Sequence, residues 1–431
     1  MEEKFLQIMK QRGLSGELME VKVYKFSVNF ENNRFKSIEE GETSGIAVRL
    51  KKNNKLGLSY STNSEDIEGT VQHAYENADV SQEVNFDFAG PSNVPDTLCF
   101  DRDIENLDRN EIVNTGKENI DFIGSLREGV QGFFSMSKEI VSERILTTEG
   151  FSGKYNKSIL SSQMGGVDAQ EGNFLWVFGE IGRASKNLLD IGILREKIKK
   201  NFKDAEKNVK IESGKYTVIF TPFSVGYLLL PFQFAFNARN VVKGTSILKD
   251  KLNQEVFSKN LTIINDPLLP HGIATAAFDD EGVPSERKDL VFRGKPVNYL
   301  TDLFSANKLN LKPGNASRGL STSPVPSSAN ILIEPGNEKL KDILKVKKGI
   351  IIESLMGVQM GNVNGGEVTG NIELGYLIEN GEIAGRVKDA MISLNIMDAL
   401  KDIVLSEETI WTDFLLSPYI LIPNASISTK S

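Results

Sequence analysis

The run Tyr216-Thr-Val-Ile-Phe-Thr221 is followed by a long apolar segment, Phe223 to Phe236, and then by Asn237-Ala-Arg239. The first run has the β-branched and aromatic composition of a strand. We interpret the second as an apolar helix, predicted over Phe223–Arg239. Hydrolases often place metal ligands or a nucleophile where a strand and a helix are followed by polar residues. The apolar segment contains no His, Cys, Asp or Glu, so we expect no catalytic group on it.

Apolar and polar residues alternate in the first part of the chain. The alternation runs through Phe26, Val28 and Phe30, with turns expected at Asn32-Asn33 and at Asn53-Asn54. Period-two alternation with Asn-rich turns is typical of an antiparallel meander with one buried face. We therefore expect the first domain to be built on an antiparallel sheet.

Helical periodicity follows the meander. Ser64 to Ala78 has its apolar residues on one helical stripe, with Ser64 as the expected N-cap. Further helices are predicted over Arg109–Leu126 and Leu188–Lys207, with two or three strands between Lys138 and Gly182. These elements predict an α+β N-terminal domain over residues 1–208. It comprises the meander and helix to about residue 80 and a central part over about residues 104–208.

The second half, residues 209–431, is richer in strands and glycine. The polar stretch Asp204 to Gly214 indicates the domain boundary, and Glu379-Asn-Gly381 is a hairpin signal. A helix is expected over Ile396–Leu405. The predicted fold class is α+β, with a C-terminal domain of antiparallel β structure and a few helices. Its expected strands are Tyr216–Phe220, Leu261–Ile264, Val291–Arg293, Ile331–Ile333, Gly349–Glu353, Gly375–Ile378, Ala390–Leu394 and Tyr419–Ile422.

Composition argues against several classes of function. The net charge of −8 argues against a general nucleic-acid binder, because such a protein needs a basic face. The single cysteine, Cys99, can form no internal disulfide, so a reducing compartment is expected. The N-terminus lacks the pattern of a secretory signal, and the longest apolar run, Val225–Phe236, is too short to cross a bilayer. We expect a cytoplasmic protein that binds neither nucleic acid nor membrane.

Few residues have the pattern of a catalytic site. No His-Glu-x-x-His, Cys-x-x-Cys or Gly-x-Ser-x-Gly motif is present. His73 is expected to be exposed, whereas His271 follows a strand and is a candidate. The run Asp279-Asp-Glu281 could hold a hard cation or act as an acid–base pair. Alternatively, it forms a turn in which Gly282 supplies a positive φ.

A cluster of glycines lies later in the chain, at Gly361, Gly365 and Gly366 among the asparagines Asn362 and Asn364. A P-loop would need a preceding strand and a Gly-Lys-Ser/Thr ending, and this segment has neither the spacing nor the lysine. The cluster instead indicates a tight loop that lines an interior surface.

Short phrases recur in a fixed order along the chain: Glu42-Thr-Ser-Gly-Ile-Ala-Val-Arg49, Gly244-Thr-Ser246, Phe278-Asp-Asp-Glu-Gly-Val283, Ser305-Ala-Asn-Lys-Leu309, Glu353-Ser-Leu-Met-Gly357, Val368-Thr-Gly370 and Gly375-Tyr-Leu-Ile-Glu-Asn-Gly-Glu382. In this order they resemble the TldD/PmbA family, for which an older label is modulator of DNA gyrase. No single phrase is decisive, but together they are specific. The resemblance covers nearly the whole chain.

The resemblance also indicates a branch of the family. TldD-like members carry His-Glu-x-x-x-His on the apolar helix, and its glutamate would be the general base on a zinc-bound water. Counting back from Gly244 places Leu229 and Phe234 near the two ligand positions and Leu230 near the glutamate position. TldD-like members also carry a cysteine later in the chain, and Cys99 lies in the wrong half to match it. The chain therefore resembles the PmbA (TldE) branch, which lacks zinc ligands.

What the resemblance implies is a non-catalytic subunit of a TldD/TldE-type zinc metalloprotease that acts on unfolded or leader-type peptides. The chain would hold no cofactor, be inactive alone, and pair with a zinc-containing TldD-like subunit or with itself. The pair would enclose an internal cavity, and extended peptide would dock by strand addition. Residues expected at the cavity or in contact with peptide are Asn237, Arg239, His271, Asp280, Glu281, Gly361, Gly365 and Gly366.

Two alternatives stay open at this point. The chain could be an independent hydrolase that uses a different metal site, through Asp279, Asp280, Glu281 or His271. It could also be a stand-alone homodimeric protein that binds peptides or acts as a scaffold. The sequence names neither the peptide nor the stoichiometry.

Overall fold

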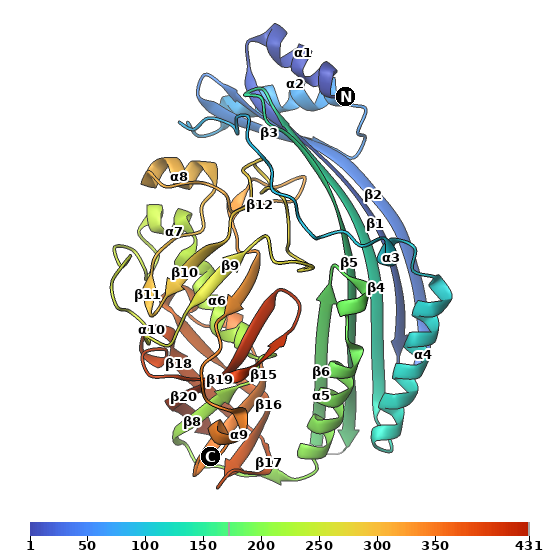
Figure 1. Cartoon of the computed structure of the whole chain (residues 1–431), viewed down its shortest axis with the longest axis vertical. Coiled ribbons are helices and arrows are strands. Elements are labelled where there is room, and N and C mark those ends of the chain that lie inside the picture. Colours follow the sequence, from blue (N-terminus) through green and yellow to red (C-terminus); the bar gives the residue numbers. More distant parts are fainter. Residues whose placement is uncertain (171–172, 430–431) are drawn as a thin grey trace.

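Six antiparallel strands form one long curved sheet in the N-terminal half of the protein (Figure 1). The computed structural model describes residues 1–170 and 173–429. The strands lie in the order β3-β2-β1-β4-β5-β6, so the predicted meander and the later strands belong to the same sheet. Their bounds are β1 (Ser15–Glu31), β2 (Arg34–Lys52), β3 (Lys55–Ser61), β4 (Gln131–Thr147), β5 (Ser152–Gln170) and β6 (Asn173–Arg183).

The two asparagine pairs close the first two hairpins, as predicted. Asn32 and Asn33 have φ values of 52° and 59°, and Asn53 and Asn54 have values of 51° and 61°. Two-residue hairpin turns need this left-handed backbone, which asparagine tolerates better than most residues. A bulge near Asn29 then shifts the pairing of β1 with β2 by one residue. This shift decides which side chains face each other farther along the two strands.

Helices cover one face of this sheet. Leu18, Phe26 and Val28 of β1 point to that face and pack beneath the helices, whereas Met19 points to the opposite face and packs near Phe278 of the C-terminal half. The two faces therefore have different partners. The helices of this half are α1 (Glu2–Arg12), α2 (Ile67–Asn77), α3 (Arg102–Glu105), α4 (Arg109–Leu126) and α5 (Ile191–Asp204), with 3-10 turns η1 (Ala78–Val80) and η2 (Lys186–Leu188).

The N-cap predicted for α2 was wrong. The helix begins at Ile67, and Asp66 caps it because its side chain accepts a hydrogen bond from the backbone N–H of Gly69. Ser64 lies two residues too early to reach the free N–H groups of the first turn. By contrast, α4 has the predicted bounds.

Twelve strands form the C-terminal sheet, and the predicted α+β class is confirmed. The pairs β8–β15, β14–β20 and β7–β17 are parallel, and the other pairings are antiparallel. Every strand expected from the sequence overlaps an observed one. The bounds are β7 (Asn208–Val209), β8 (Gly214–Phe220), β9 (Ile263–Asp266), β10 (Lys288–Phe292), β11 (Lys295–Pro296), β14 (Asn330–Ile333), β15 (Lys348–Met356), β16 (Glu367–Glu379), β17 (Glu382–Val387), β18 (Ala390–Asn395), β19 (Val404–Trp411) and β20 (Leu415–Thr429), with β12 (Ala316–Ser317) and β13 (Val325–Pro326) in a separate pair.

Two predicted C-terminal helices differ from the structure. The expected helix Ile396–Leu405 is only one turn long, since β19 already begins at Val404, and the expected helix Phe223–Arg239 is divided at Asn237. Within the described residues, no helix is long and apolar enough to span a lipid bilayer. The helices are α6 (Val225–Phe236), α7 (Ala238–Lys243), α8 (Leu303–Leu309), α9 (Leu340–Ile343) and α10 (Ile396–Ala399), with 3-10 turns η3 (Val358–Met360) and η4 (Val363–Gly365).

Helix α5 packs against both halves of the protein. Leu194 and Ile198 lie in a core that also contains Ile351 and Tyr376 of the C-terminal sheet. The Tyr376 hydroxyl donates a hydrogen bond to the carbonyl oxygen of Asn201 over 3.0 Å. The helix thus fixes the two sheets relative to each other, while the division of the chain after residue 208 stays a prediction.

A glycine in β3 tests how tightly the first helices pack. A Cβ added at Gly57 would lie 1.8 Å from the backbone oxygen of Ala74 in α2, so Gly57→Ala must displace the helix. We expect a loss of roughly 1–3 kcal/mol of stability, typical of overpacking. The control is Gly41→Ala in β2, where an added Cβ meets no atom within 4 Å. Thermal unfolding followed by circular dichroism measures both, and equal midpoints would contradict the packing described here.

Candidate functional site

Helix α6 occupies the centre of the C-terminal half. The Ser224 hydroxyl precedes it and donates to the carbonyl oxygen of Ile352 over 2.7 Å. Phe232 and Phe236 stack on its buried side with ring centroids 5.6 Å apart. The helix ends because Asn237 has an extended backbone and its side chain accepts a hydrogen bond from the N–H of Arg239, which caps α7.

The three motif positions on α6 do not converge. Leu229 is buried and lines a small apolar void of about 20 Å³ with Phe232 and Phe236. Leu230 and Phe234 lie one turn apart and line a different hollow of about 260 Å³. Positions five residues apart stand about 140° apart on a helix, so this divergence is expected.

These side chains do not fit a zinc ion. The two leucines and Phe234 are hydrocarbons without the nitrogen, oxygen or sulfur that zinc requires. In residues 1–170 and 173–429, no group of three or more His, Cys, Asp or Glu is arranged to hold a metal ion. What α6 offers at these positions is an apolar wall.

The glycine cluster forms the opposite wall of the larger hollow. Gly361 lines it together with Asn362, Leu230 and Phe234. The Asn362 side chain accepts a hydrogen bond from the N–H of Gly365 over 3.1 Å, which folds the loop back on itself. Gly366, with φ of 85°, turns the chain away toward β16 and does not line this hollow. The structure therefore brings together Gly361 and α6, as a tight loop against a helix.

Asn237 instead connects the start of α7 to β13, and Arg239 connects α7 to α8. Asn237 donates from its amide nitrogen to the carbonyl oxygen of Pro326 over 3.1 Å. Arg239 Nε donates to Asp302 Oδ2 over 2.6 Å. Asp302 is fully buried and also caps α8 in a capping box with Ser305. Both candidates thus have structural contacts that order the start of a helix.

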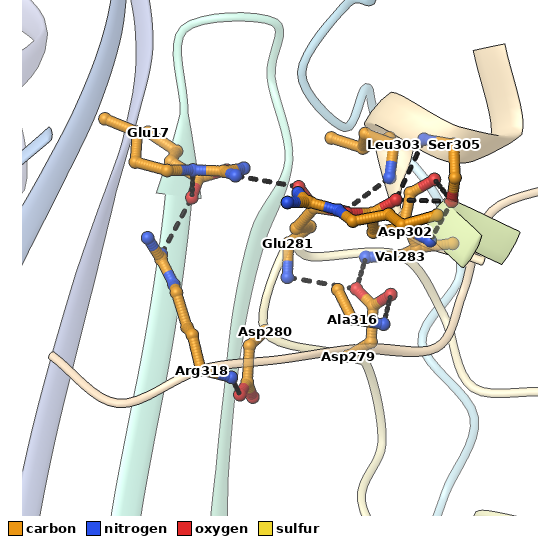
Figure 2. A network of polar contacts seen from close by, with 12 residues as sticks. Glu17, Asp279, Asp280, Glu281, Val283, Asp302, Leu303, Ser305, Ala316 and Arg318 are labelled. Carbon is orange, nitrogen blue, oxygen red and sulfur yellow. Dashed lines mark hydrogen bonds and ion pairs between the residues drawn. The ribbon is translucent and has the colours of Figure 1, made fainter. Parts of the chain in front are cut away.

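The acidic run Asp279-Asp-Glu281 forms a turn in a buried polar network between the two halves of the protein (Figure 2). Gly282 has φ of 77°, as the turn interpretation predicts. Asp279 accepts hydrogen bonds from the backbone N–H groups of Glu281 and Val283 through Oδ1 and from that of Ala316 through Oδ2. The Asp279 carboxylate, a candidate cation ligand, is therefore occupied by backbone donors.

Arg49 of β2 connects this turn to the N-terminal sheet. Arg49 Nε lies 2.7 Å from Glu17 Oε1, and Nη1 lies 2.8 Å from Glu281 Oε1. Glu281 Oε2 accepts a hydrogen bond from the N–H of Leu303 at the start of α8 over 2.6 Å. Arg318 Nη2 lies 2.7 Å from Glu17 Oε1. All four charged side chains are at most 1% exposed.

Burial and charge act in opposite directions on the pKa values in this network. Burial alone would lower the pKa of Arg49, but Glu17 and Glu281 hold it above its ordinary value. Burial raises the pKa of Glu281, while Arg49 opposes the rise. Burial also lowers the pKa of Arg318. The network is therefore a set of mutually compensated charges rather than a poised acid–base pair.

Asp280 faces a second buried group of side chains. Its Oδ2 accepts a hydrogen bond from the N–H of Arg318 over 2.6 Å, and burial raises its pKa. Its neighbour Glu143 of β4 accepts a hydrogen bond from the Tyr155 hydroxyl over 2.9 Å. Burial, reinforced by Asp280, raises the pKa of Glu143 to about 8. In this carboxyl pair Glu143 is the group that holds a proton, and the nearby charge of Lys157 acts to lower the pKa of both carboxyls.

The two histidines are separate from these groups. His73 is exposed, as expected. His271 has φ of 62° and is clamped by its backbone: its N–H donates to Leu98 over 2.7 Å, and its carbonyl accepts from Ala184 over 2.9 Å. Its position strengthens the contact between the two halves. The contact of these candidate residues with peptide stays a prediction.

Sequence reasoning missed Glu17, Arg49, Arg318 and Glu143 as members of the buried network. Glu17 and Arg49 are paired across β1 and β2, but the bulge near Asn29 changes the register that a simple hairpin would give. The available signal was Arg49 within the apolar run Ile46-Ala-Val-Arg-Leu50. Arg318 follows β12 in a loop and gave no such signal.

Removing Arg49 should destabilise the whole protein. Arg49→Leu leaves Glu17 and Glu281 buried without their partner, and we expect a loss of about 3–5 kcal/mol. The matched control is Arg109→Leu, because Arg109 pairs with Glu40 at the surface and is 61% exposed. That change should cost at most about 1 kcal/mol. Urea unfolding measures both, and equal losses would show that the buried network is not decisive.

The carboxyl pair predicts a dependence of stability on pH. The pKa of Glu143 is raised in the folded state, so the folded protein holds a proton that the unfolded chain releases. Stability should be greatest below the unfolded pKa and should fall as pH rises through about 8. Glu143→Gln keeps an acceptor for Tyr155 and should flatten this fall. The control is Glu139→Gln, a change on the same strand as Glu143 that removes an ion pair with Lys25. Melting curves between about pH 5 and 9 measure the slopes, and parallel curves would contradict the assignment.

Comparisons with known proteins agree on one family. Residues 213–429 match the model of the PmbA/TldA metallopeptidase C-terminal domain, and residues 16–78 match that of PmbA/TldA metallopeptidase domain 1. An uncharacterized protein of Methanocaldococcus jannaschii is 26% identical, with 99% of both chains covered. A metalloprotease of the same organism is 25% identical, with 91% of this chain and 88% of that protein covered. PmbA metalloprotease of Escherichia coli O157:H7 is 29% identical over 45% of this chain and 41% of its own.

Solved structures share the whole fold. A Thermotoga maritima protein, named for a suggested role as modulator of a DNA gyrase, has a TM-score of 0.90 at 23% identity, with 99% of both chains covered. TldE of Thermococcus kodakarensis has a TM-score of 0.89 at 19% identity, with 99% of both chains covered. These likenesses extend over the N-terminal sheet, α6 and the C-terminal sheet together. With the C-terminal model matched over half of the chain, the protein belongs to the PmbA/TldD metallopeptidase family.

Proposed function

We propose that this chain is the non-catalytic, TldE-like subunit of a TldD/TldE-type zinc metalloprotease that cleaves unfolded or leader-type peptides. It pairs with a TldD-like chain, which supplies the zinc and the catalytic glutamate. Its own roles are to enclose the cavity, to hold extended peptide and to stabilise the partner.

One observation carries the proposal. Helix α6 presents Leu229, Leu230 and Phe234 near the positions that hold His, Glu and His in the TldD-like branch. A hydrolytic zinc site needs ligands on the metal and a general base near its bound water. Three hydrocarbon side chains supply neither, while the surrounding family fold is complete.

The buried turn weighs against an independent hydrolase. Asp279 and Glu281 have their oxygens bonded to backbone N–H groups and to Arg49. His271 lies instead at the contact with Leu98 and Ala184. A metal site made from these groups would have to break the contacts that join the two halves. The names of the relatives support the pairing, because both PmbA and TldD metalloproteases are among them.

The TldD-like chain from the same organism provides the test. Co-expression should yield a complex with about one zinc ion per pair, held by the partner's motif. The complex should cleave an unfolded peptide, and a zinc chelator should abolish the cleavage. The chain purified alone should contain no stoichiometric zinc and show no cleavage.

A matched control separates assembly from chemistry. Replacing the glutamate of the partner's motif by glutamine should preserve the complex and its zinc but abolish cleavage, since that glutamate acts as the general base. The proposal fails if this chain, free of any TldD-like protease, binds stoichiometric zinc and hydrolyses peptide. It also fails if the chain forms only a homodimer and never captures the partner, which would favour a scaffold or peptide-binding role.

A further inference from the structure

A cleft of about 260 Å³ lies between the two halves of the protein, beside the start of α6. Edge strand β6 and helix α5 form one wall, and the C-terminal half forms the other. The cleft is below the roughly 300–1,000 Å³ typical of pockets for drug-sized ligands, so it suits a single side chain or a small molecule. Its polar lining includes Glu180, Lys197, Glu353, Ser354, Glu373 and Asp413.

The charges that line this cleft do not balance. Lys197 Nζ lies 2.5 Å from Glu353 Oε2, and these two side chains are only 8% and 10% exposed, so they neutralise each other. Glu180, Glu373 and Asp413 remain. Glu180 accepts a hydrogen bond from the neutral Gln163 amide over 2.8 Å. The side chains that line the cleft therefore include more carboxyl groups than ammonium groups.

Two arginines near the cleft donate their N–H groups to backbone oxygens and keep their positive charge. Arg183 lies close to Asp413, yet its guanidinium donates to the backbone oxygens of Gly182, Trp411 and Thr412. Arg386 donates to the backbone oxygens of Phe174 and Glu373. Neither arginine is within ion-pair distance of a cleft carboxylate among the described residues, but the charge of Arg183 acts on Asp413 and that of Arg386 on Glu373. With Lys197 and these two arginines counted against the four carboxylates, one carboxylate is in excess.

Asp413 is the carboxylate with the greatest need for a partner. Its Oδ1 is shielded from solvent and has no hydrogen-bond partner among the described residues. Burial, reinforced by the nearby carboxylate of Glu180, raises the pKa of Asp413 to about 7. Two carboxyl groups brought together in this way resist ionisation unless a cation lies between them.

Aromatic rings complete the lining. Trp176, Phe178, Phe223, Tyr227 and Phe414 all border the cleft. Phe178 and Phe414 are 36% and 40% exposed, which is high for large apolar side chains. Aromatic faces attract organic cations through their quadrupoles. The cleft already shows this contact, because Lys197 Nζ lies 4.7 Å from the centre of the Phe223 ring.

We propose that this cleft binds one organic cation, a guanidinium or primary ammonium group, between the Glu180–Asp413 carboxylates and the aromatic rings. A bare metal ion fits less well, because no three acidic groups of the described residues converge as metal ligands. A guanidinium spreads its charge over five N–H donors and stacks on rings, so it can serve separated carboxylates at once.

The cation has two sources with the same chemistry. It is either the side chain of a basic residue in a peptide or a free polyamine. The peptide source rests on the proposed function, and it would make this subunit select substrates that carry arginine or lysine. The cleft itself is complete in the single chain, so binding can be tested without the catalytic partner.

The experiment titrates the isolated full-length chain with three probes at about pH 8, where Asp413 is ionised. The probes are N-acetylarginine methylamide, its neutral isostere N-acetylcitrulline methylamide, and spermidine. Calorimetry and the fluorescence of Trp176 and Trp411 report binding. We expect the arginine probe to bind at least about tenfold more tightly than the citrulline probe, because only the former carries the charge.

Charge-matched variants locate the site. Glu180→Gln combined with Asp413→Asn should weaken arginine binding by about tenfold or more. The control combines Glu379→Gln with Glu382→Gln on the exposed β16–β17 hairpin, which removes the same charge and should leave binding unchanged. Glu180→Gln alone, which keeps a partner for Gln163, serves if the double variant fails to fold.

Equal binding of the arginine and citrulline probes would overturn the proposal, as would equal weakening in the cleft and hairpin variants. Competition by spermidine supports a free polyamine as a source, and binding of the arginine probe alone supports a basic peptide side chain. Failure of the protein to pair with a TldD-like chain would remove the peptide role but would leave these binding results unchanged. The two proposals therefore fail separately.

Discussion

The Arg49 guanidinium, held between Glu17 and Glu281, is the interaction on which the arrangement of the two halves depends. Two carboxylates and a guanidinium that are almost completely shielded from water are costly to desolvate, and they become tolerable only when every partner is in place. This requirement explains the local structure around them. Gly282 bends the turn so that Glu281 faces β2, and Asp279 holds that bend by accepting hydrogen bonds from backbone N–H groups. Glu281 also accepts a hydrogen bond from the N–H of Leu303 in the first turn of α8.

Contacts within the C-terminal half place α6. The helix lies between the apolar core of the C-terminal sheet and the glycine loop, with its beginning beside the cleft against β6. In a family of metallopeptidases this is a position suited to chemistry, yet Leu229, Leu230 and Phe234 make it a packing surface. The polar groups near the helix lie in its surroundings, at the carboxylates of the cleft and at the loop that contains Gly361.

The sequence was sufficient for elements that depend on local rules. Asn32-Asn33 and Asn53-Asn54 predicted the hairpins, because few other residues tolerate two successive left-handed conformations. It was insufficient where distant residues decide. One bulge near Asn29 changes the partner of Glu17, so the buried ion pair could not be read from the turn alone. The end of α6 at Asn237 was missed because that residue caps a second helix directly after the first, and an apolar run gives no sign of such a junction.

The two contacts between the halves differ in how their charge is balanced, and this difference separates structure from function. In the buried network, Arg49 lies against Glu17 and Glu281 and Arg318 lies against Glu17, so two cations and two carboxylates of the chain itself balance in charge. In the cleft, Lys197 pairs with Glu353, whereas Arg183 near Asp413 and Arg386 near Glu373 form no ion pair, and one carboxylate is in excess. A protein gains no stability from leaving Glu180 and Asp413 close together in a partly buried space. The excess carboxylate in the cleft is the reason that we propose a cation from outside the chain there and none at the buried network.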